Sequence, residues 1–335
     1  GVARQFLVDP EWVTKLMEDR VLDIHPCIHC HNGCFNMAHY EGVPNVQPLN
    51  DSLHMARCAL NPVTMHTNKY KIIPAKRTKN VAVIGGGIGG MEAALVLAKR
   101  GHNVTIYEKS DVLGGVFIAA SNFSFKDADK ALIEYYRREI KKFENIKVKF
   151  NTEIKDASTL KEDEIIVATG AKAKSLPING AQNTIKAVDL LSGKYTKDVG
   201  DTPIIIGGGL TGCELAYEFL LQGRHPVILE AKGDLIPTAG VCLANSSYLR
   251  DYIHWKEAKV FLHCWIKEIG DNNVTIADSN GVTKIIDGTS VILSVGYKPN
   301  PVFKESRNIH YVGDCYEVGN LKTVIWRAWD VAMKI

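Results

Sequence analysis

The chain has 335 residues, of which 46% are hydrophobic and 23% are charged. At roughly 150 residues per domain, this length predicts about two domains, and the composition excludes a disordered chain, a fibrous repeat and a miniature scaffold. The net charge of +3, from 40 basic and 37 acidic side chains, is too balanced to favour nucleic acid or an anionic membrane as a partner. We expect a small-molecule substrate. The sequence is also compatible with a homo-oligomer.

Membrane and export signals are absent from the sequence pattern. No run approaches the roughly 18 consecutive apolar residues that a membrane helix needs, and Arg4, Asp9 and Glu11 interrupt any signal-peptide core. Four of the eight cysteines lie in one short segment and the others are scattered, unlike a secreted disulfide framework. These features predict a cytoplasmic protein.

The part of the chain before residue 80 shows little regular pattern. Residues 1–26 contain one expected helix, with Asp9 as a plausible N-cap and Pro10 as a natural first helical residue. Residues 27–79 have no sustained period, yet they hold four cysteines and five histidines. Such a segment usually needs something other than a hydrophobic core to hold it.

From residue 80 the sequence predicts a strand, a glycine turn, an amphipathic helix and a second strand, which together form a βαβ unit. Gly85, Gly87 and Gly90 form the pattern G-x-G-x-x-G directly after the first strand. These glycines permit the tight turn, the approach of a pyrophosphate and close helix–strand packing. Glu108 ends the second strand, where an acidic residue can accept hydrogen bonds from an adenosine ribose. The unit predicts a dinucleotide site.

The same pattern recurs further along the chain with identical spacing. Gly207, Gly209 and Gly212 follow another apolar strand, and Glu230 lies as far beyond Gly212 as Glu108 lies beyond Gly90. Because Glu230 would repel a 2′-phosphate, this second site favours NADH over NADPH. Two nucleotide sites in one chain suggest that electrons pass between two cofactors.

Three further motifs accompany the fingerprints: Gly114-Gly115, the turn Ala168-Thr169-Gly170, and Val312-Gly313-Asp314 near the end of the chain. With these, the sequence resembles the two-dinucleotide-binding-domain flavoproteins, the α/β fold shared by thioredoxin reductase and glutathione reductase. The resemblance implies hydride transfer from NAD(P)H at the second site to FAD at the first, and an NAD domain inserted into the FAD domain. The FAD-binding residues it implies are Gly85, Gly87, Gly90, Glu108, Lys109, Gly114, Gly115, Ala168, Thr169, Gly170, Gly313 and Asp314. The NADH-binding residues it implies are Gly207, Gly209, Gly212, Glu230 and Gly296.

Glu214 matches a glutamate that lies near the nicotinamide in similar reductases, but it can equally be a first-turn acid favoured by the helix dipole. The expected NAD domain holds no C-x-x-C pair, so thioredoxin reductase activity is not expected. Its cysteines are expected to be small buried hydrophobes: Cys213, Cys242 and Cys264.

The most informative constellation consists of four cysteines in one segment: Cys27, Cys30, Cys34 and, after a longer gap, Cys58. Four thiolates suit either tetrahedral zinc or an iron-sulfur cluster. The three-plus-one spacing fits a four-iron four-sulfur (4Fe-4S) cluster better than the paired knuckles of a zinc site, and zinc is redox-inert. A histidine, His39 or His54, could replace Cys58 as a ligand.

This cluster pattern, followed by Asn61-Pro62, resembles the flavin and iron-sulfur enoate reductases related to old yellow enzyme, including 2-enoate reductase, 2,4-dienoyl-CoA reductase and trimethylamine dehydrogenase. In that family an FMN-bearing TIM barrel precedes the cluster segment, and Arg4 occupies an arginine position near the end of that barrel. The stretch HYEGVPNVQPLN lengthens the gap before Cys58 and reads as a surface loop. The domains implied are 1–26, a barrel remnant; 27–79, the iron-sulfur segment; 80–172 and 296–335, the FAD-binding domain; and 173–295, the NAD(P)H-binding domain.

The resemblance implies the electron-input module of an NADH-dependent enoate reductase about twice as long as this chain. Electrons would pass from NADH to FAD, to a 4Fe-4S cluster and to FMN in the barrel, where an activated C=C bond of a small-molecule substrate is reduced. One alternative is a freestanding NADH:acceptor reductase that serves a partner protein. Another is a non-redox ADP-binding module, as in trimethylamine dehydrogenase, although the intact second fingerprint argues against it.

Overall fold

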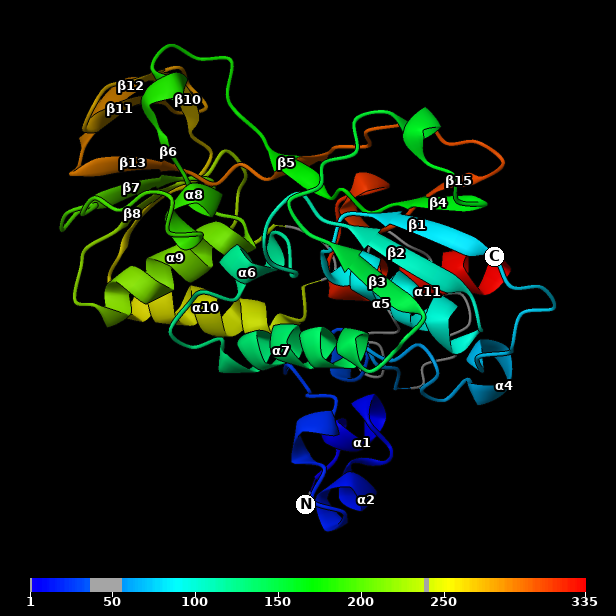
Figure 1. The fold of residues 1–335 in the computed structure, drawn as a ribbon. Coiled ribbons are helices and arrows are strands. Elements are labelled where there is room, and N and C mark those ends of the chain that lie inside the picture. Colours follow the sequence, from blue (N-terminus) through cyan, green and yellow to red (C-terminus); the bar gives the residue numbers. More distant parts are fainter. Residues whose placement is uncertain (1, 37–55, 238–240) are drawn as a thin grey trace. The chain divides into compact units, whose positions relative to one another are not determined.

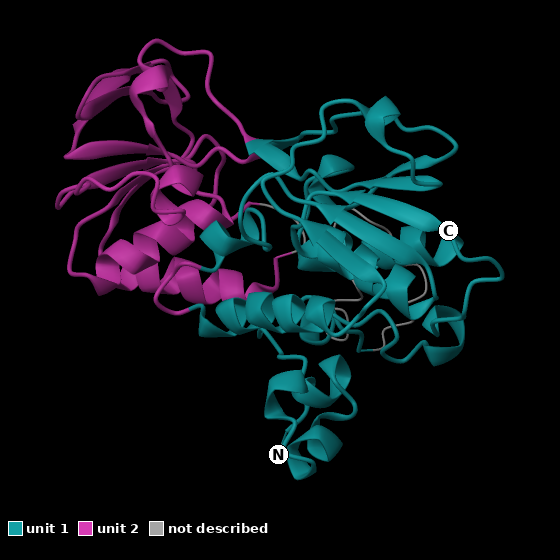
Figure 2. Cartoon of the chain, in the orientation of Figure 1, with its two compact units in different colours: residues 1–121, 126–172, 298–335 teal, residues 122–125, 173–297 magenta. Residues whose placement is uncertain are grey.

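The computed structural model describes residues 2–36, 56–237 and 241–335 (Figure 1). The chain divides into two compact units, which Figure 2 shows in different colours. Unit 1 comprises Gly1–Ser121, Lys126–Lys172 and Lys298–Ile335, and unit 2 comprises Asn122–Phe125 and Ala173–Tyr297. A two-stranded sheet pairs β5 (Ala171–Ala173) with β14 (Tyr297–Pro299).

Unit 1 is built on a parallel five-stranded sheet in the order β15-β4-β1-β2-β3. The strands are β1 (Asn80–Ile84), β2 (Asn103–Tyr107), β3 (Ile146–Lys149), β4 (Glu164–Val167) and β15 (Ile309–Tyr311). The central strand β1 is buried after its first residue, as expected of a parallel strand that is covered on both faces. The predicted strand at the start of the first βαβ unit therefore forms the middle of the sheet.

Three helices cover one face of this sheet: α5 (Ile88–Lys99), α7 (Asp127–Lys141) and α11 (Leu321–Lys334). Val81 and Val83 of β1 pack with these helices, whereas Ala82 and Ile84 belong to a separate core on the opposite face. This alternation follows from the two-residue period of a strand. The shorter elements of unit 1 around the sheet are α6 (Phe117–Ala120), η2 (Ala157–Thr159) and η4 (Gly313–Cys315).

The N-terminal part of unit 1 is a set of short helices rather than the single helix that the sequence predicts. They are α1 (Arg4–Val8), α2 (Trp12–Met17), η1 (Val21–Asp23) and α4 (Thr67–Tyr70). The N-cap of α2 is Glu11, so the prediction that Asp9 caps it is wrong. The Asp9 carboxylate is buried and accepts hydrogen bonds from the Glu11 N–H at 3.1 Å, directly before α2, from Lys15 and from the His25 backbone N–H. Asp9 itself is the C-cap of α1, so two short helices stand where the sequence predicts one.

Unit 2 repeats the central pattern of unit 1 in a second parallel sheet, in the order β6-β13-β7-β8-β9. Its strands are β6 (Ile185–Lys186), β7 (Pro203–Ile206), β8 (Val227–Leu229), β9 (Lys259–Phe261) and β13 (Ser290–Leu293). An antiparallel sheet adds β10 (Trp265–Ile269), β11 (Asn273–Ala277) and β12 (Thr283–Asp287). The helical elements are η3 (Ala181–Asn183), α8 (Ala187–Leu191), α9 (Leu210–Leu221) and α10 (Leu243–Trp255).

The two parallel sheets place their glycine turns equivalently. In each, the strand before the turn (β1 or β7) lies beside the strand after the following helix (β2 or β8). Within the residues that the structure describes, no helix is long and apolar enough to cross a membrane.

Candidate functional site

The first glycine turn is shaped by close contact with neighbouring backbone. Gly85 has a left-handed φ of 106°, and a Cβ there would lie 2.5 Å from the carbonyl oxygen of Ala168. A Cβ at Gly90 would lie 2.0 Å from the Gly85 carbonyl oxygen. Gly87 is the N-cap of α5, and helix N-termini favour phosphate binding. Gly85 and Gly90 thus meet the steric requirement that the fingerprint predicts.

Other predicted FAD residues converge on this turn from distant parts of unit 1. Gly114 forms an isolated bridge with Gly87, and a Cβ at Gly115 would lie 3.1 Å from the Gly87 Cα. A Cβ at Gly89, in the first turn of α5, would lie 3.6 Å from the Gly313 Cα. Three loops that are far apart in the sequence therefore meet at the start of α5.

The remaining predicted residues of this site lie around the same strands. Thr169 donates its hydroxyl to the Asn300 carbonyl at 2.7 Å, which ties the A-T-G turn to the returning chain. Asp314 accepts from the Gly319 N–H at 3.1 Å, and burial raises the pKa of this carboxyl. Gly170 has a left-handed φ of 67°, and Lys109 is exposed directly after Glu108.

Glu108 and Glu230 make equivalent contacts in the two units. In unit 1, the Glu108 carboxylate accepts from the Gly86 N–H at 2.7 Å and from the Ser110 N–H at 2.8 Å. In unit 2, the Glu230 carboxylate accepts from the Gly208 N–H at 2.7 Å and from the Lys232 N–H at 2.8 Å. A carboxylate has about four acceptor positions, so each keeps capacity for a ribose hydroxyl.

The second glycine turn reproduces the steric pattern of the first. Gly207 has the same φ of 106°, and a Cβ there would lie 2.3 Å from the Ser294 carbonyl oxygen. A Cβ at Gly212 would lie 1.9 Å from the Gly207 carbonyl oxygen. Gly209 is the N-cap of α9 and has no atom within 4 Å of its Cβ position. Gly296 has a left-handed φ of 85° in the stretch that leads from β13 to β14.

Glu214 is the fifth residue of α9, beyond its first turn, where no acidic residue lies. The interpretation as a first-turn acid favoured by the helix dipole is therefore not supported, and the side chain is buried. The expectation that three cysteines of the inserted domain are buried is confirmed: they are Cys213, Cys242 and Cys264.

The four cysteines of the N-terminal segment line one cavity. Its other lining residues are Arg4, Leu7, Val8, Ile28, His31, Gly33, Ala59 and Leu60. Gly33 allows this assembly, because a Cβ there would lie 2.6 Å from the backbone nitrogen of Ala59. The Arg57 N–H also donates to the Gly33 carbonyl at 2.6 Å. The chain around Cys34 therefore packs directly on the backbone around Cys58.

Gly33 is absent from the residues that the sequence predicts for this site. Its place directly before Cys34 was the available signal, because a glycine within a short ligand loop often marks close backbone approach.

Backbone amides support the sulfur atoms in this cavity. The N–H group two residues further along the chain points to the sulfur of Cys27, Cys30 and Cys58, and for Cys58 the sulfur lies 3.4 Å from the Leu60 nitrogen. Burial raises the pKa of Cys30 and of Cys58 to about 12. Coordination by a metal ion or cluster would require these side chains in their thiolate form.

Among the described residues, no group of three or more Cys, His, Asp and Glu side chains is arranged to hold a metal ion. His39, His54 and the stretch HYEGVPNVQPLN lie outside the described residues.

A family model described as pyridine nucleotide-disulphide oxidoreductase matches residues 79–316. The chain belongs to this family. The family match and the two parallel sheets confirm the predicted α/β fold with two dinucleotide-binding domains. The family is one of NAD(P)H-dependent flavoprotein oxidoreductases that bind FAD.

Curated relatives extend the match to the whole chain. It is 34% identical over 344 residues to the cinnamate reductase of Clostridium sporogenes, covering 100% of this chain and 49% of the relative. It is 29% identical over 351 residues to the NADH oxidase of Thermoanaerobacter brockii, covering 100% of this chain and 51% of the relative. The chain thus spans about half the length of these relatives, and the predicted resemblance to enoate reductases is confirmed.

Solved structures also match most or all of this chain. A 2-naphthoyl-CoA reductase in complex with 2-naphthoyl-CoA superposes with a TM-score of 0.86 at 29% identity, over 99% of this chain and 50% of that one. The thioredoxin reductase of T. acidophilum superposes with a TM-score of 0.62 at 18% identity, over 77% of this chain and 97% of that one. The second likeness concerns the fold alone.

Proposed function

We propose that this chain is the electron-input part of an NADH-dependent flavin and iron-sulfur reductase that acts on an activated C=C bond. Electrons from NADH would pass in turn to FAD, to a 4Fe-4S cluster and to FMN in a barrel domain outside this chain. Residues 1–26 would belong to the end of that barrel and 27–79 to the cluster segment. The scattered free cysteines of the rest of the chain favour the reducing cytoplasm.

The observation that carries this proposal is that a dinucleotide turn and a four-cysteine cavity lie in the same unit, unit 1. The cysteine segment is bonded to the helical core of that unit: the Trp326 indole N–H donates to the Cys58 carbonyl at 3.0 Å. Trp326 lies on α11, which packs with α5, the helix that follows the first glycine turn. One hydrophobic core would therefore support both the site for a two-electron acceptor and the site for a one-electron carrier.

The chain's own residues have definable tasks in this scheme. Flavin supplies the step between hydride and single electrons, which nicotinamide cannot make. The amides at the start of α5 and α9 would bind the two pyrophosphates, while Glu108 and Glu230 would accept from the adenosine riboses. Cys27, Cys30, Cys34 and Cys58 would hold the cluster.

The proposed preference for NADH rests on Glu230. Its carboxylate is buried and already fixed by two backbone N–H groups, so it cannot easily turn away from a 2′-phosphate. One of these two N–H groups is that of Lys232. A fixed negative charge at the ribose hydroxyls disfavours NADPH.

The substrate class follows from the relatives. A cinnamate reductase and a 2-naphthoyl-CoA reductase are named for substrates in which unsaturated carbon is conjugated to a carboxyl or thioester group. We infer a substrate of this kind, in which the carbonyl activates the C=C bond and which binds through the FMN barrel.

The test is anaerobic purification of the chain, followed by cofactor analysis and titration with NADH. We expect bound FAD, iron and acid-labile sulfide, and bleaching of the flavin absorbance by NADH. Bound ADP or an NADH-insensitive flavin would instead indicate a non-redox module. Complete NADH-driven turnover with a separate electron-acceptor protein, without any barrel domain, would favour a freestanding reductase.

A further inference from the structure

Helix α1 has no task in the function proposed above, except as the end of another domain. Yet three of its residues, Arg4, Leu7 and Val8, line the cavity that the four cysteines form. The helix has only five residues, too few to be stable alone. Its position therefore depends on hydrogen bonds to other segments, and these bonds show which segments α1 connects.

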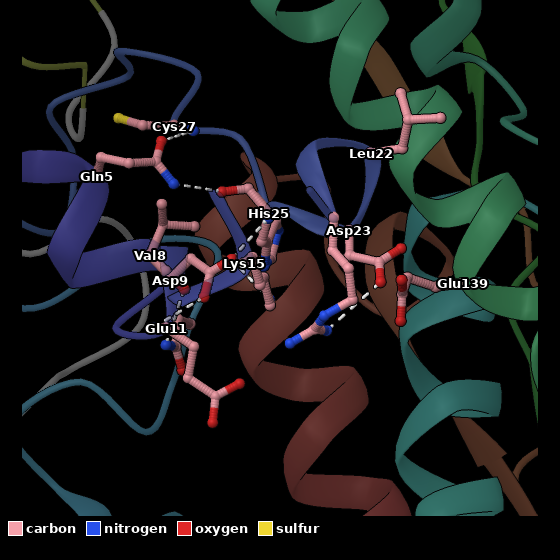
Figure 3. A network of polar contacts seen from close by, with 12 residues as sticks. Gln5, Val8, Asp9, Glu11, Lys15, Leu22, Asp23, His25, Cys27 and Glu139 are labelled. Carbon is pink, nitrogen blue, oxygen red and sulfur yellow. Dashed lines mark hydrogen bonds and ion pairs between the residues drawn. The ribbon is translucent and has the colours of Figure 1, made fainter. Parts of the chain in front are cut away.

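Gln5 joins α1 to the segment that carries the first cysteine. Its side-chain Nε2 donates to the His25 carbonyl at 2.7 Å, and its Oε1 accepts from the Cys27 N–H at 3.1 Å (Figure 3). Pro26 has no N–H, so the backbone donors beside it are those of His25 and Cys27. The His25 N–H donates to Asp9, the residue that ends α1. Both N–H groups thus donate to side chains of α1 and its C-cap: His25 to Asp9, and Cys27 to Gln5.

Asn61 joins the other end of α1 to the segment that carries the last cysteine. Its side-chain Nδ2 donates to the Val8 carbonyl at 3.0 Å, and the Thr64 hydroxyl donates to the Leu7 carbonyl. These carbonyls belong to the last turn of α1, where helices lack internal donors. The Asn61 Oδ1 accepts from the Val63 N–H at 3.0 Å, which fixes the side chain in this orientation.

We propose that α1 is a structural part of the cysteine site, and that Gln5 and Asn61 are positioning residues for Cys27 and Cys58. The helix connects two loops whose cysteines lie far apart in the sequence. By holding both loops, it sets the separation of the two sulfurs across the cavity. The inference rests on the proposed cluster, because it assigns α1 a role in holding it.

The experiment compares Gln5→Ala and Asn61→Asp in the complete chain, purified anaerobically. Asn61→Asp keeps the bond to Val63 and removes the donor to α1. We measure iron and sulfide content, the electron paramagnetic resonance spectrum after dithionite reduction, and the rate of iron release to a chelator. Each variant loses one or two hydrogen bonds, so we expect iron release to be roughly fivefold to tenfold faster and the spectrum to be altered. The exposed Gln182→Ala in unit 2 is the matched control and should behave as wild type.

The double variant tests whether one helix connects both loops. If it does, breaking either end already frees the helix, and the double variant should release iron no faster than the more affected single variant. Independent contacts would instead multiply the two effects, and that result would overturn the inference.

The outcomes separate the inference from the function on which it rests. A wild-type chain without iron overturns the proposed function and the inference with it. A wild-type chain with a cluster, whose spectrum and iron release neither substitution changes, overturns the inference alone. If a variant also loses its flavin, hydrogen exchange on the wild-type chain decides: we expect slow exchange of the Cys27 N–H, and fast exchange there would refute the bond to Gln5.

Discussion

The dinucleotide turns and the cysteine segment are held together in different ways. Each turn lies between a buried parallel strand and a helix, and its shape is enforced by backbone packing that repeats in both units. The cysteine segment has short helices and relies on single side-chain bonds, such as those of Gln5 and Asn61. We therefore expect the first architecture to form without a ligand, and the second to gain stability from the cluster proposed for its thiols.

Removing a cysteine ligand should have the largest effect. We expect Cys34→Ala to abolish iron binding, while the flavin stays bound and is still bleached by NADH, because the glycine turn of unit 1 makes its own contacts. Iron analysis and anaerobic NADH titration measure the two properties separately. Cys264→Ala, which removes a buried thiol of unit 2, should keep its iron. Loss of flavin together with iron in Cys34→Ala would show that the two regions depend on each other.

A methyl group at Gly90 should disrupt the dinucleotide turn of unit 1. Its Cβ would lie 2.0 Å from the Gly85 carbonyl oxygen, and this backbone cannot move without shifting β1 or α5. We expect Gly90→Ala to lower the free energy of unfolding by about 3 kcal/mol or more and to prevent flavin binding. Chemical denaturation and flavin content provide the test.

The contrasting substitution is Gly209→Ala in unit 2, where a Cβ meets no atom within 4 Å. Its free energy of unfolding should stay within about 0.5 kcal/mol of the wild type. Because the methyl group would occupy space that a pyrophosphate needs, the KM for NADH should rise while the flavin is retained. A normal KM would place the pyrophosphate elsewhere.

Replacing Glu230 should have a moderate effect on the preference for NADH over NADPH. Glu230→Gln retains a hydrogen-bond acceptor but removes the charge that opposes a 2′-phosphate. We expect the ratio of kcat/KM for NADH to that for NADPH to fall by roughly tenfold, or about 1.4 kcal/mol. Glu268→Gln, an exposed change in the same unit, should leave the ratio unchanged. A wild-type chain that already prefers NADPH would contradict the role assigned to Glu230.

The same contrast explains which features the sequence predicts. The glycine turns were predictable because their requirements are local: a strand, three spaced glycines and an acid at the end of the next strand. The four cysteines were predictable as a group because their spacing is itself the signal. The bonds of Gln5 and Asn61, and the contact of Gly33 with Ala59, were not predictable, because they join residues far apart in a segment without periodicity. The prediction that Asp9 begins a helix was wrong for a similar reason, because the Asp9 carboxylate also binds the distant His25 N–H.

The smallest expected effect concerns Glu92, where the regular core of unit 1 meets its N-terminal segment. Glu92 lies on α5, and its buried carboxylate accepts from the Tyr136 hydroxyl at 2.8 Å. The neighbouring Tyr135 on α7 stacks on His25, with ring centroids 4.4 Å apart. Burial raises the pKa of Glu92 from 4.5 to about 6. The folded state therefore binds this proton more tightly than the unfolded state does.

The sign of the resulting pH dependence follows from this difference. The stabilising contribution of protonated Glu92 is complete below pH 4.5 and is lost as the pH rises to about 6. The shift corresponds to about 2 kcal/mol. Glu92→Gln keeps an acceptor for Tyr136 without a charge, so at pH 7 it should be more stable than wild type by up to about 2 kcal/mol. The difference should shrink towards pH 4.5. Denaturation curves across this range measure it, and a Glu92→Gln variant that is less stable than wild type at pH 7 would mean that the charged carboxylate is needed where the two regions meet.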